Sequence, residues 1–284
     1  MSDIMSYLFA TDAIRICEEN KPFWYTSGKI GPYFINTHFV YGDEHSAVSL
    51  LNFIDEALAD KISLPNEVFQ KVLEQYNTNK IYQDVINSMK QYIEENINVD
   101  EIDYISGGER RDWFFSNMLA YLLDKPHISI FKDLSTVISN SKFENSSIVT
   151  SLEGKKVLHI ADLITVASSY IRAWIPAIEN LGSTMCWSCS VVDRMQGGKE
   201  NIEAKGVKSF SLVNIDFNLF QKAFELGIIN QNQLDMLHRF IENPDATMRD
   251  FLIQHPEFLE NALNSDEKTK KRAKLLVDGN LYNL

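Results

Sequence analysis

Short apolar runs alternate with helical patterns through the middle of the chain, and this alternation restricts the fold more than any other feature. Strand-like runs occupy residues 102–106, 126–131, 156–161, 185–192 and 210–213. Parallel strands need a long connection, normally a helix, between one strand and the next. The alternation therefore predicts an α/β fold with a mostly parallel sheet and flanking helices. It also predicts that the strands ending at Ile105, Phe131 and Ala161 point into one cleft.

Helical patterns dominate the segments on either side of these strands. Apolar residues recur at helical spacing in 46–59 and again in 65–97, which predicts two amphipathic helices in the second segment. The C-terminal part carries only helical patterns, at residues 217–225, 231–241 and 247–263. We therefore expect a core domain over residues 1–216 with a helical insert at about 60–100, followed by a helical extension over 217–284.

Two further segments have a local character of their own. Residues 23–36 are aromatic and are interrupted by two glycines and Pro32, which is typical of short extended pieces joined by tight turns. Residues 135–151 are rich in Ser and Asn and predict a mobile loop or a hairpin.

The net charge of the chain limits its partners. The 284 residues include 27 Lys and Arg against 39 Asp and Glu, for a formal net charge of −12. Duplex nucleic acid is bound by clustered basic residues that neutralise phosphates, so we do not expect this acidic chain to bind it.

Cysteine usage and the first residues indicate the compartment. Three cysteines do not form a disulfide framework, and Cys186 and Cys189 lie in a predicted strand, where positions three apart face opposite sides. We therefore interpret this pair as structural rather than redox-active. The first four residues lack the basic segment of a signal peptide, and no apolar run approaches the ~18 residues of a membrane span. These features predict a soluble, cytoplasmic protein with no membrane partner.

The histidines and the most basic run of the sequence are interpreted as structural or solvated residues rather than as functional sites. The six histidines show no spacing typical of metal ligands, so no metal-ligating residues are predicted. His159 lies within a predicted strand and is expected to be buried. The run Lys268 to Lys274 is expected to be the solvated face of a terminal helix.

The first candidate site lies where the strand at 102–106 meets the next helix, in the sequence SGGERRD. Gly107 and Gly108 let the backbone turn and bring amide groups close to an anion. Arg110 and Arg111 follow at once, and guanidinium groups suit phosphate oxygens. The alternative interpretation is a tight turn with solvated arginines.

The second candidate site follows the strand at 156–161. Asp162 ends the strand, and Thr165, Ser168 and Ser169 lead into a helix, so backbone amides and three hydroxyls face a possible phosphate monoester. Asp162 could orient ribose hydroxyls or a hydrated Mg²⁺. The alternative interpretation is a capped helix start with Ser168 or Ser169 as N-cap.

These two junctions and the aromatic segment together resemble the type I phosphoribosyltransferases, and within them orotate phosphoribosyltransferase. The matching stretches follow the family's order and cover most of residues 10–216 apart from the helical insert. They read FWYTSGKIGPYFINT, YISGGERRDWFFSNMLAYLLDKPHISIFKD, GKKVLHIADLITVASSYIRAWIPAIENLGS and VVDRMQGGKENIEAKGVKSFSL.

The resemblance implies an activity. Such an enzyme transfers phosphoribosyl from 5-phosphoribosyl-1-pyrophosphate to a nucleobase and releases pyrophosphate, with Mg²⁺ as cofactor. The implied acceptor is a pyrimidine-like base, either orotate or a base of shifted specificity, and the implied pathway is pyrimidine nucleotide biosynthesis. The resemblance also implies a homodimer.

The resemblance further implies a set of site residues. The catalytic residues would be Lys132 and Arg111, which meet the pyrophosphate. Tyr33, Phe34 and Arg194 would hold the base. The residues that bind phosphoribosyl pyrophosphate would be Gly107, Gly108, Glu109, Arg110, Arg111, Lys132, Asp162, Thr165, Val166, Ala167, Ser168 and Ser169.

The sequence departs from the family's pattern at several of these loops. Ala161 replaces the first of two adjacent acidic residues, residues 165–168 read TVAS where the family has Thr-Thr-Gly-Gly, and Thr26 replaces a lysine. Residues 134–138 lack the lysine and histidine of the mobile catalytic loop, which Lys142 could replace from a displaced register. The alternative hypothesis is therefore a non-catalytic protein of this fold that binds a nucleotide or a protein partner.

Overall fold

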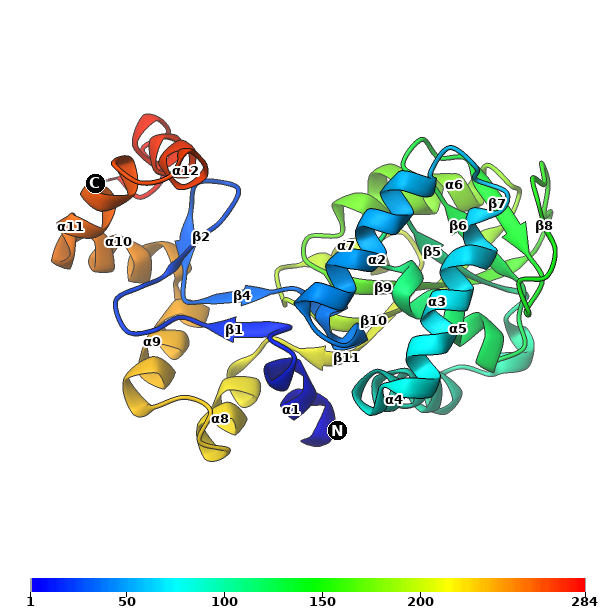
Figure 1. Cartoon of the computed structure of the whole chain (residues 1–284), viewed down its shortest axis with the longest axis horizontal. Helices are drawn as coiled ribbons and strands as arrows, with labels where there is room; N and C mark the ends of the chain where they lie inside the picture. The colour runs from blue at the N-terminus through cyan, green and yellow to red at the C-terminus, as the bar shows by residue number, and fades with distance from the viewer. Residues whose placement is uncertain (1, 284) are drawn as a thin grey trace. The chain divides into compact units, whose positions relative to one another are not determined.

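The computed structural model describes residues 2–283, which pack as two compact units (Figure 1). The first unit comprises the described residues up to Asp12 together with Thr37–Ile215. The second comprises Ala13–Asn36 together with the described residues from Asp216 on. The chain therefore passes three times between the units.

A seven-stranded sheet in the order β11-β10-β9-β5-β6-β7-β8 forms the centre of the first unit. The five strands from β11 to β6 run parallel, and β7 and β8 are antiparallel additions at one edge. This arrangement confirms the predicted α/β class with a mostly parallel sheet. The strand bounds are Tyr104–Gly108 (β5), His127–Ile130 (β6), Thr136–Ser139 (β7), Ser146–Ser147 (β8), Lys156–Ile164 (β9), Thr184–Asp193 (β10) and Lys208–Asn214 (β11).

The helices of the first unit contact this sheet and one another. The predicted insert is confirmed as two helices, α3 and α4, and Asn79 caps α4 by accepting a hydrogen bond from the amide of Tyr82 at 3.0 Å. The bounds are Ser2–Ala10 (α1), Glu44–Ala57 (α2), Leu64–Thr78 (α3), Lys80–Asn96 (α4), Trp113–Leu122 (α5), Ile175–Glu179 (α6) and Gly198–Glu203 (α7). Shorter turns are the 3-10 helices Thr37–Tyr41 (η1) and Val99–Glu101 (η2) and the π-helix Tyr170–Trp174 (η3).

Strand β9 shows why the sheet is buried on both faces. Every residue from Val157 to Asp162 is buried, which is typical of a parallel strand covered on both sides. Val157 and Ala161 pack with Tyr170 and Trp174 of η3 in one apolar cluster. His159 points to the same face and is fully buried, as predicted.

Two short antiparallel ribbons and five helices form the second unit. Ile14–Ile16 (β1) pairs with Tyr33–Ile35 (β4), and Phe23–Trp24 (β2) pairs with Ile30–Gly31 (β3), which confirms the extended pieces expected in the aromatic segment. The helices are Phe217–Glu225 (α8), Gln231–Glu242 (α9), Pro244–Gln254 (α10), Pro256–Leu263 (α11) and Glu267–Asp278 (α12). The prediction of one helix over 247–263 was wrong, because the chain leaves helical geometry at His255, directly before Pro256.

Long-range contacts hold the ribbons against these helices. The Lys29 ammonium lies 2.7 Å from a carboxylate oxygen of Asp245, and the Tyr282 hydroxyl accepts a hydrogen bond from the amide of Ile30 at 2.9 Å. The ring of Trp24 stacks on Phe258, with 5.5 Å between ring centroids. Residues 13–36 therefore pack with the C-terminal helices, whereas we expected them within the core domain that ends at residue 216.

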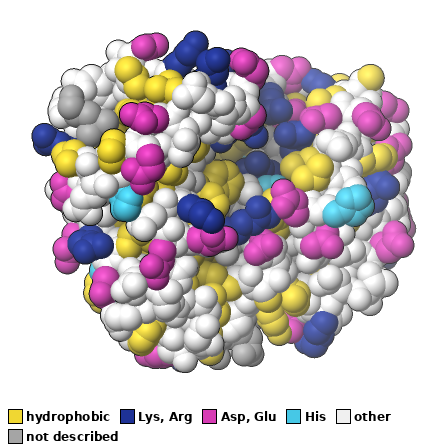
Figure 2. Space-filling model, turned by 60° about the vertical axis from the view of Figure 1, so that its left-hand side comes forward, with side chains coloured by type: hydrophobic (Ala, Val, Ile, Leu, Met, Phe, Trp, Pro, Cys, Tyr) yellow, Lys and Arg dark blue, Asp and Glu magenta, His cyan; other side chains and the backbone are white. Residues whose placement is uncertain are grey.

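The distribution of surface charge and the positions of the cysteines match what the sequence predicts. Figure 2 shows acidic and basic side chains interspersed over the face drawn, rather than one extended basic field. Lys268, Lys271 and Lys274 are exposed on α12.

Cys186 and Cys189 lie in β10 as predicted, and both are free thiols. Among residues 2–283, no helix is long and apolar enough to span a membrane.

Candidate functional site

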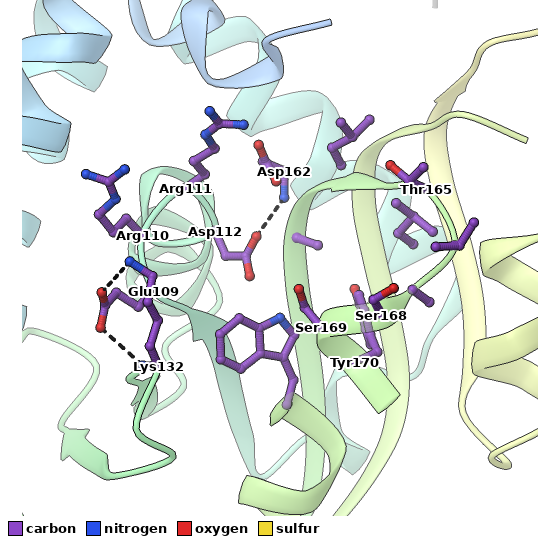
Figure 3. A pocket seen from close by; sticks show the side chains of 16 residues that line it. Glu109, Arg110, Arg111, Asp112, Lys132, Asp162, Thr165, Ser168, Ser169 and Tyr170 are labelled. Atoms are coloured by element: carbon purple, nitrogen blue, oxygen red, sulfur yellow. Dashed lines mark hydrogen bonds and ion pairs between the residues drawn. The ribbon is translucent and has the colours of Figure 1, made fainter. Parts of the chain in front are cut away.

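A cavity of about 440 Å³ opens at the carboxyl ends of β5, β6 and β9 (Figure 3). Parallel strands bring their carboxyl ends to one edge of the sheet, which explains why distant segments meet here. The expected convergence of these three strand ends is therefore confirmed. Ten of the predicted residues line the cavity: Glu109, Arg110, Arg111, Lys132, Asp162, Thr165, Val166, Ala167, Ser168 and Ser169.

The two loops face each other across this cavity. Figure 3 shows Glu109, Arg110, Arg111 and Lys132 on one side and Thr165, Ser168 and Ser169 on the other. Asp112 and Asp162 lie between the two groups. We refer to residues 109–112 as the arginine loop and to residues 165–169 as the amide loop.

Gly107 and Gly108 do not form the predicted turn, because both lie within β5. A Cβ atom on Gly107 would stand 2.2 Å from the Ser116 hydroxyl, and one on Gly108 would stand 2.3 Å from the Trp174 indole. The amide of Gly108 donates to the Asp112 carboxylate at 3.0 Å. These glycines are thus explained by close packing, and neither lines the cavity.

The three cationic side chains on this side of the cavity, Arg110, Arg111 and Lys132, differ in whether they form ion pairs with neighbouring carboxylates. Arg110 forms an ion pair with Asp55 of α2. Lys132 lies 3.0 Å from a carboxylate oxygen of Glu109, whose other oxygen accepts from the Lys132 amide at 3.2 Å. The Arg111 side chain is exposed, and its guanidinium makes no hydrogen bond or ion pair with the residues that the structure describes. Arg111 is therefore the cation of this loop that is available to a ligand.

Asp112 connects the two sides of the cavity; the sequence placed it at the end of the first candidate loop but indicated no role of its own for it. One carboxylate oxygen accepts from the amide of Gly108, and the other accepts from the amide of Asp162 at 3.1 Å. Nε2 of His159 lies 3.5 Å from the first of these oxygens. An acidic residue directly after two arginines, at the start of α5, was the signal in the sequence that could have indicated it.

Asp162 is the second buried carboxylate of the site. It lies within β9, which extends to Ile164, so the loop that we expected from residue 162 begins only at Thr165. Burial, and then the neighbouring charge of Asp112, raise the pKa of Asp162 from its usual value of 3.8 to about 7, against the opposing effect of Arg111. Its Oδ2 atom is buried and accepts no hydrogen bond from any described residue.

The amide loop offers backbone donors at a helix start. The amides of Thr165, Val166 and Ala167 donate to no acceptor in the described part of the chain. Ala167 has a φ of +58°, the left-handed region that favours glycine. Ser169 precedes η3 but its side chain makes no capping hydrogen bond, so the alternative interpretation of Ser169 as a helix cap is not supported.

Lys142 lies too far away to supply charge to this cavity. It belongs to the turn between β7 and β8, and β7 runs antiparallel to β6, so this turn lies at the opposite end of the sheet. Ser141 donates a hydrogen bond to Asp124, which precedes β6. The suggestion that Lys142 replaces the missing catalytic-loop residues was therefore wrong, because residues 136–139 form strand β7, between β6 and β8, instead of a loop.

The three residues expected to hold a base do not line the cavity. Tyr33 lies in the second unit, where its ring is buried against Phe220 and Phe240. Phe34 is half-buried beside it in β4, and Arg194 follows β10, with its amide donating to the carbonyl of Ile164 at 2.9 Å. Their contact with a base stays a prediction.

Comparison with known proteins relates this architecture to solved structures. No family model matches the chain. Orotate phosphoribosyltransferase from Aquifex aeolicus is 36% identical over 62 residues, which are 22% of this chain and 33% of that protein. The chain thus matches about a third of the length of that curated relative.

Two solved structures share the fold at low sequence identity. UMP synthase from Leishmania donovani superposes with a TM-score of 0.58 and 14% identity, over 85% of this chain and 42% of the other. Orotate phosphoribosyltransferase from Francisella tularensis superposes with a TM-score of 0.53 and 14% identity, over 84% of this chain and 98% of the other. At these identities the likeness shows a common fold.

Proposed function

Because the chain has the fold of the type I phosphoribosyltransferases, we propose that it transfers phosphoribosyl from 5-phosphoribosyl-1-pyrophosphate to a pyrimidine-like base. One observation carries this proposal: a single cavity receives the arginine loop from one side and the amide loop from the other. The donor carries pyrophosphate at one end of its ribose and a phosphate monoester at the other. Its two charged ends therefore match two anion-binding loops that face each other.

In the proposed reaction the loops have separate tasks. Arg111, with Lys132 beside it, would hold the pyrophosphate, while the amides of residues 165–167 and the hydroxyls of the amide loop would hold the 5-phosphate. The bond from ribose C1 to the pyrophosphate oxygen breaks, and pyrophosphate takes the electron pair. A ring nitrogen of the base forms the new bond to C1 and gives up its proton. Positioning and neutralisation of the leaving group supply most of the catalysis.

The carboxylates of the site fit a magnesium ion that arrives with the substrate. Both oxygens of Glu109 and of Asp112 already accept hydrogen bonds or ion pairs, whereas Oδ2 of Asp162 accepts none from the described residues. Mg²⁺ is often held by one or two carboxylates together with substrate phosphates. Asp162 would hold the ion, which would neutralise phosphate charge in the bound donor.

A second candidate is a non-catalytic protein that binds a phosphorylated ligand. The observation that favours it is the pairing of Lys132 with Glu109 and of Arg110 with Asp55, which leaves little free positive charge for a departing pyrophosphate. In this case the ligand would bind through the amide loop without being turned over.

A screen of nucleobases with phosphoribosyl pyrophosphate and Mg²⁺, read by pyrophosphate release, tests the two candidates. Release with orotate or another pyrimidine supports the transferase, provided that Arg111→Ala abolishes it. Donor binding without release for any base supports the second candidate. Failure of the donor to bind contradicts both.

Three further proposals follow from the same resemblance. We propose that the protein acts in pyrimidine nucleotide biosynthesis, in the cytoplasm, and as a homodimer. Analytical ultracentrifugation checks the dimer, and a single monomeric species at micromolar concentration would contradict it.

A further inference from the structure

Among the residues that the structure describes, Asp112 is the one whose side chain is hydrogen-bonded to both β5 and β9 at the cavity. Its side chain is buried, and each of its oxygens accepts a backbone amide from a different strand: Gly108 in β5 at 3.0 Å and Asp162 in β9 at 3.1 Å. The arginine loop follows Gly108, and the amide loop begins three residues after Asp162. We propose that Asp112 is a positioning residue that fixes the spacing between the two phosphate-binding loops, an inference that rests on the proposed function.

A carboxylate is the group that this position requires. Two amides point at Asp112 from opposite sides, so the side chain has to accept at both oxygens. An asparagine would present its NH₂ group to one of the two amides, placing a donor against a donor. Charge-assisted hydrogen bonds are also stronger than neutral ones, so a carboxylate holds both amides more tightly.

His159 lies beside Asp112 within the sheet. Its Nε2 lies 3.5 Å from Asp112, and its Nδ1 lies 2.9 Å from the Ser106 hydroxyl. Tyr170 packs edge-on against the imidazole, with 4.9 Å between the ring centroids. The imidazole therefore packs against the carboxylate on the side of the sheet, while the two backbone amides hold it by hydrogen bonds.

This geometry predicts that ligands that bind both loops and ligands that bind one loop respond differently to a change at Asp112. A ligand that occupies both loops needs them at a fixed separation, whereas a ligand that occupies one loop needs that loop alone. Loosening the connection between the loops should therefore weaken the binding of phosphoribosyl pyrophosphate more than the binding of pyrophosphate or ribose 5-phosphate, because simultaneous engagement depends on spacing.

The test is the affinity of Asp112→Asn for these three ligands, measured by calorimetry without a base. We expect phosphoribosyl pyrophosphate to bind at least ~10-fold more weakly, the scale of one lost charged hydrogen bond, and each of the other two ligands to lose less than ~3-fold. The matched control is Asp103→Asn. Asp103 also joins β5 and β9, by accepting from the amide of Lys156 at 2.8 Å, but at the opposite end of the sheet. We expect it to leave all three affinities unchanged.

The outcomes separate the inference from the proposed function. Equal losses for all three ligands, or no loss, would overturn the positioning role while leaving the proposed function intact. Failure of the unaltered protein to bind phosphoribosyl pyrophosphate would overturn both. If Asp112→Asn does not fold, Asp112→Glu keeps the charge but displaces the carboxylate by one methylene, and we expect the same selective loss from it.

Discussion

The arginine loop and the amide loop offer anions two different kinds of group. The arginine loop presents side-chain cations, and neighbouring carboxylates neutralise two of the three that line that side of the cavity. The amide loop presents backbone amides, whose dipoles no neighbouring side chain can remove. A site made of backbone amides thus persists when side chains change. We therefore expect binding of a phosphate monoester to be retained better than turnover.

The largest expected effect is on turnover of orotate. The engaged Lys132, the absent catalytic-loop residues and the strained Ala167 all weaken the same transition state. We expect turnover at least ~100-fold below the enzyme median of ~10 s⁻¹, with each factor of ten corresponding to about 1.4 kcal/mol. The measurement is orotate consumption with saturating phosphoribosyl pyrophosphate and Mg²⁺, beside a titration with ribose 5-phosphate. Turnover at the ordinary rate would contradict this expectation and would show that a group outside these loops supplies the charge.

The stability of the protein should depend on pH through Asp162, the carboxylate between the two loops. The unfolded chain releases the Asp162 proton near its usual pKa of 3.8, whereas the folded protein keeps it until about pH 7. Between these values the folded state binds more protons, so the free energy of unfolding falls as pH rises, by up to about 1.4 kcal/mol per pH unit. We expect Asp162→Asn to flatten this decline in urea unfolding curves.

Asp103→Asn is the control for this profile. The Lys156 amide lowers the pKa of Asp103, so its contribution is lost as pH falls through that lowered value, and its replacement should leave the decline between the two Asp162 values in place. A decline that survives Asp162→Asn would assign the titration to another group.

A smaller effect is expected at the free cation of the arginine loop. Arg111→Ala should weaken pyrophosphate binding by roughly 1.5–3 kcal/mol, the scale of a charged hydrogen bond. Arg110→Ala should cost less, because Asp55 already holds that guanidinium. Calorimetry with pyrophosphate checks both variants. Equal losses from the two would show that the ion pair with Asp55 opens on binding.

The smallest effect is expected at Ala167 of the amide loop. Its φ of +58° suits glycine, so Ala167→Gly should raise the free energy of unfolding by about 1 kcal/mol and tighten binding of ribose 5-phosphate. Ala204 is exposed at the end of α7 with a φ of −62°, and Ala204→Gly should instead lower stability slightly. A loss of stability in Ala167→Gly would show that the alanine methyl packs favourably enough to outweigh the strain.

The sequence predicted the layered fold because strand and helix periodicity are local properties. Most strands and helices lie within a few residues of their predicted places, and ten of the predicted ligand-binding residues do line the cavity. The break before Pro256 was also visible in the sequence, since the residue before a proline avoids helical geometry.

What could not be predicted depends on contacts between distant residues. Gly107 and Gly108 suggest a turn, but their missing Cβ atoms make room for Ser116 and Trp174, which periodicity cannot show. Glu109 suggests a ligand contact, but its carboxylate is occupied by Lys132. Asp112 acts through amides that the fold brings to it from two strands.

The second unit is built from two segments that are far apart in the sequence, so one segment is synthesised long before the other. Lys29 and Asp245 pair across 216 residues of sequence, so during synthesis the ribbons of residues 13–36 emerge long before α8 to α12 can cover them. The strands of the central sheet, in contrast, come from the continuous stretch 104–214. Contacts between residues far apart in the sequence form last, because closing the long loop between them costs conformational entropy. The two ribbons are therefore the part of the nascent chain that waits longest for its packing partners, and Trp24 of β2 and Tyr33 of β4 are the aromatic side chains left open to a chaperone until then.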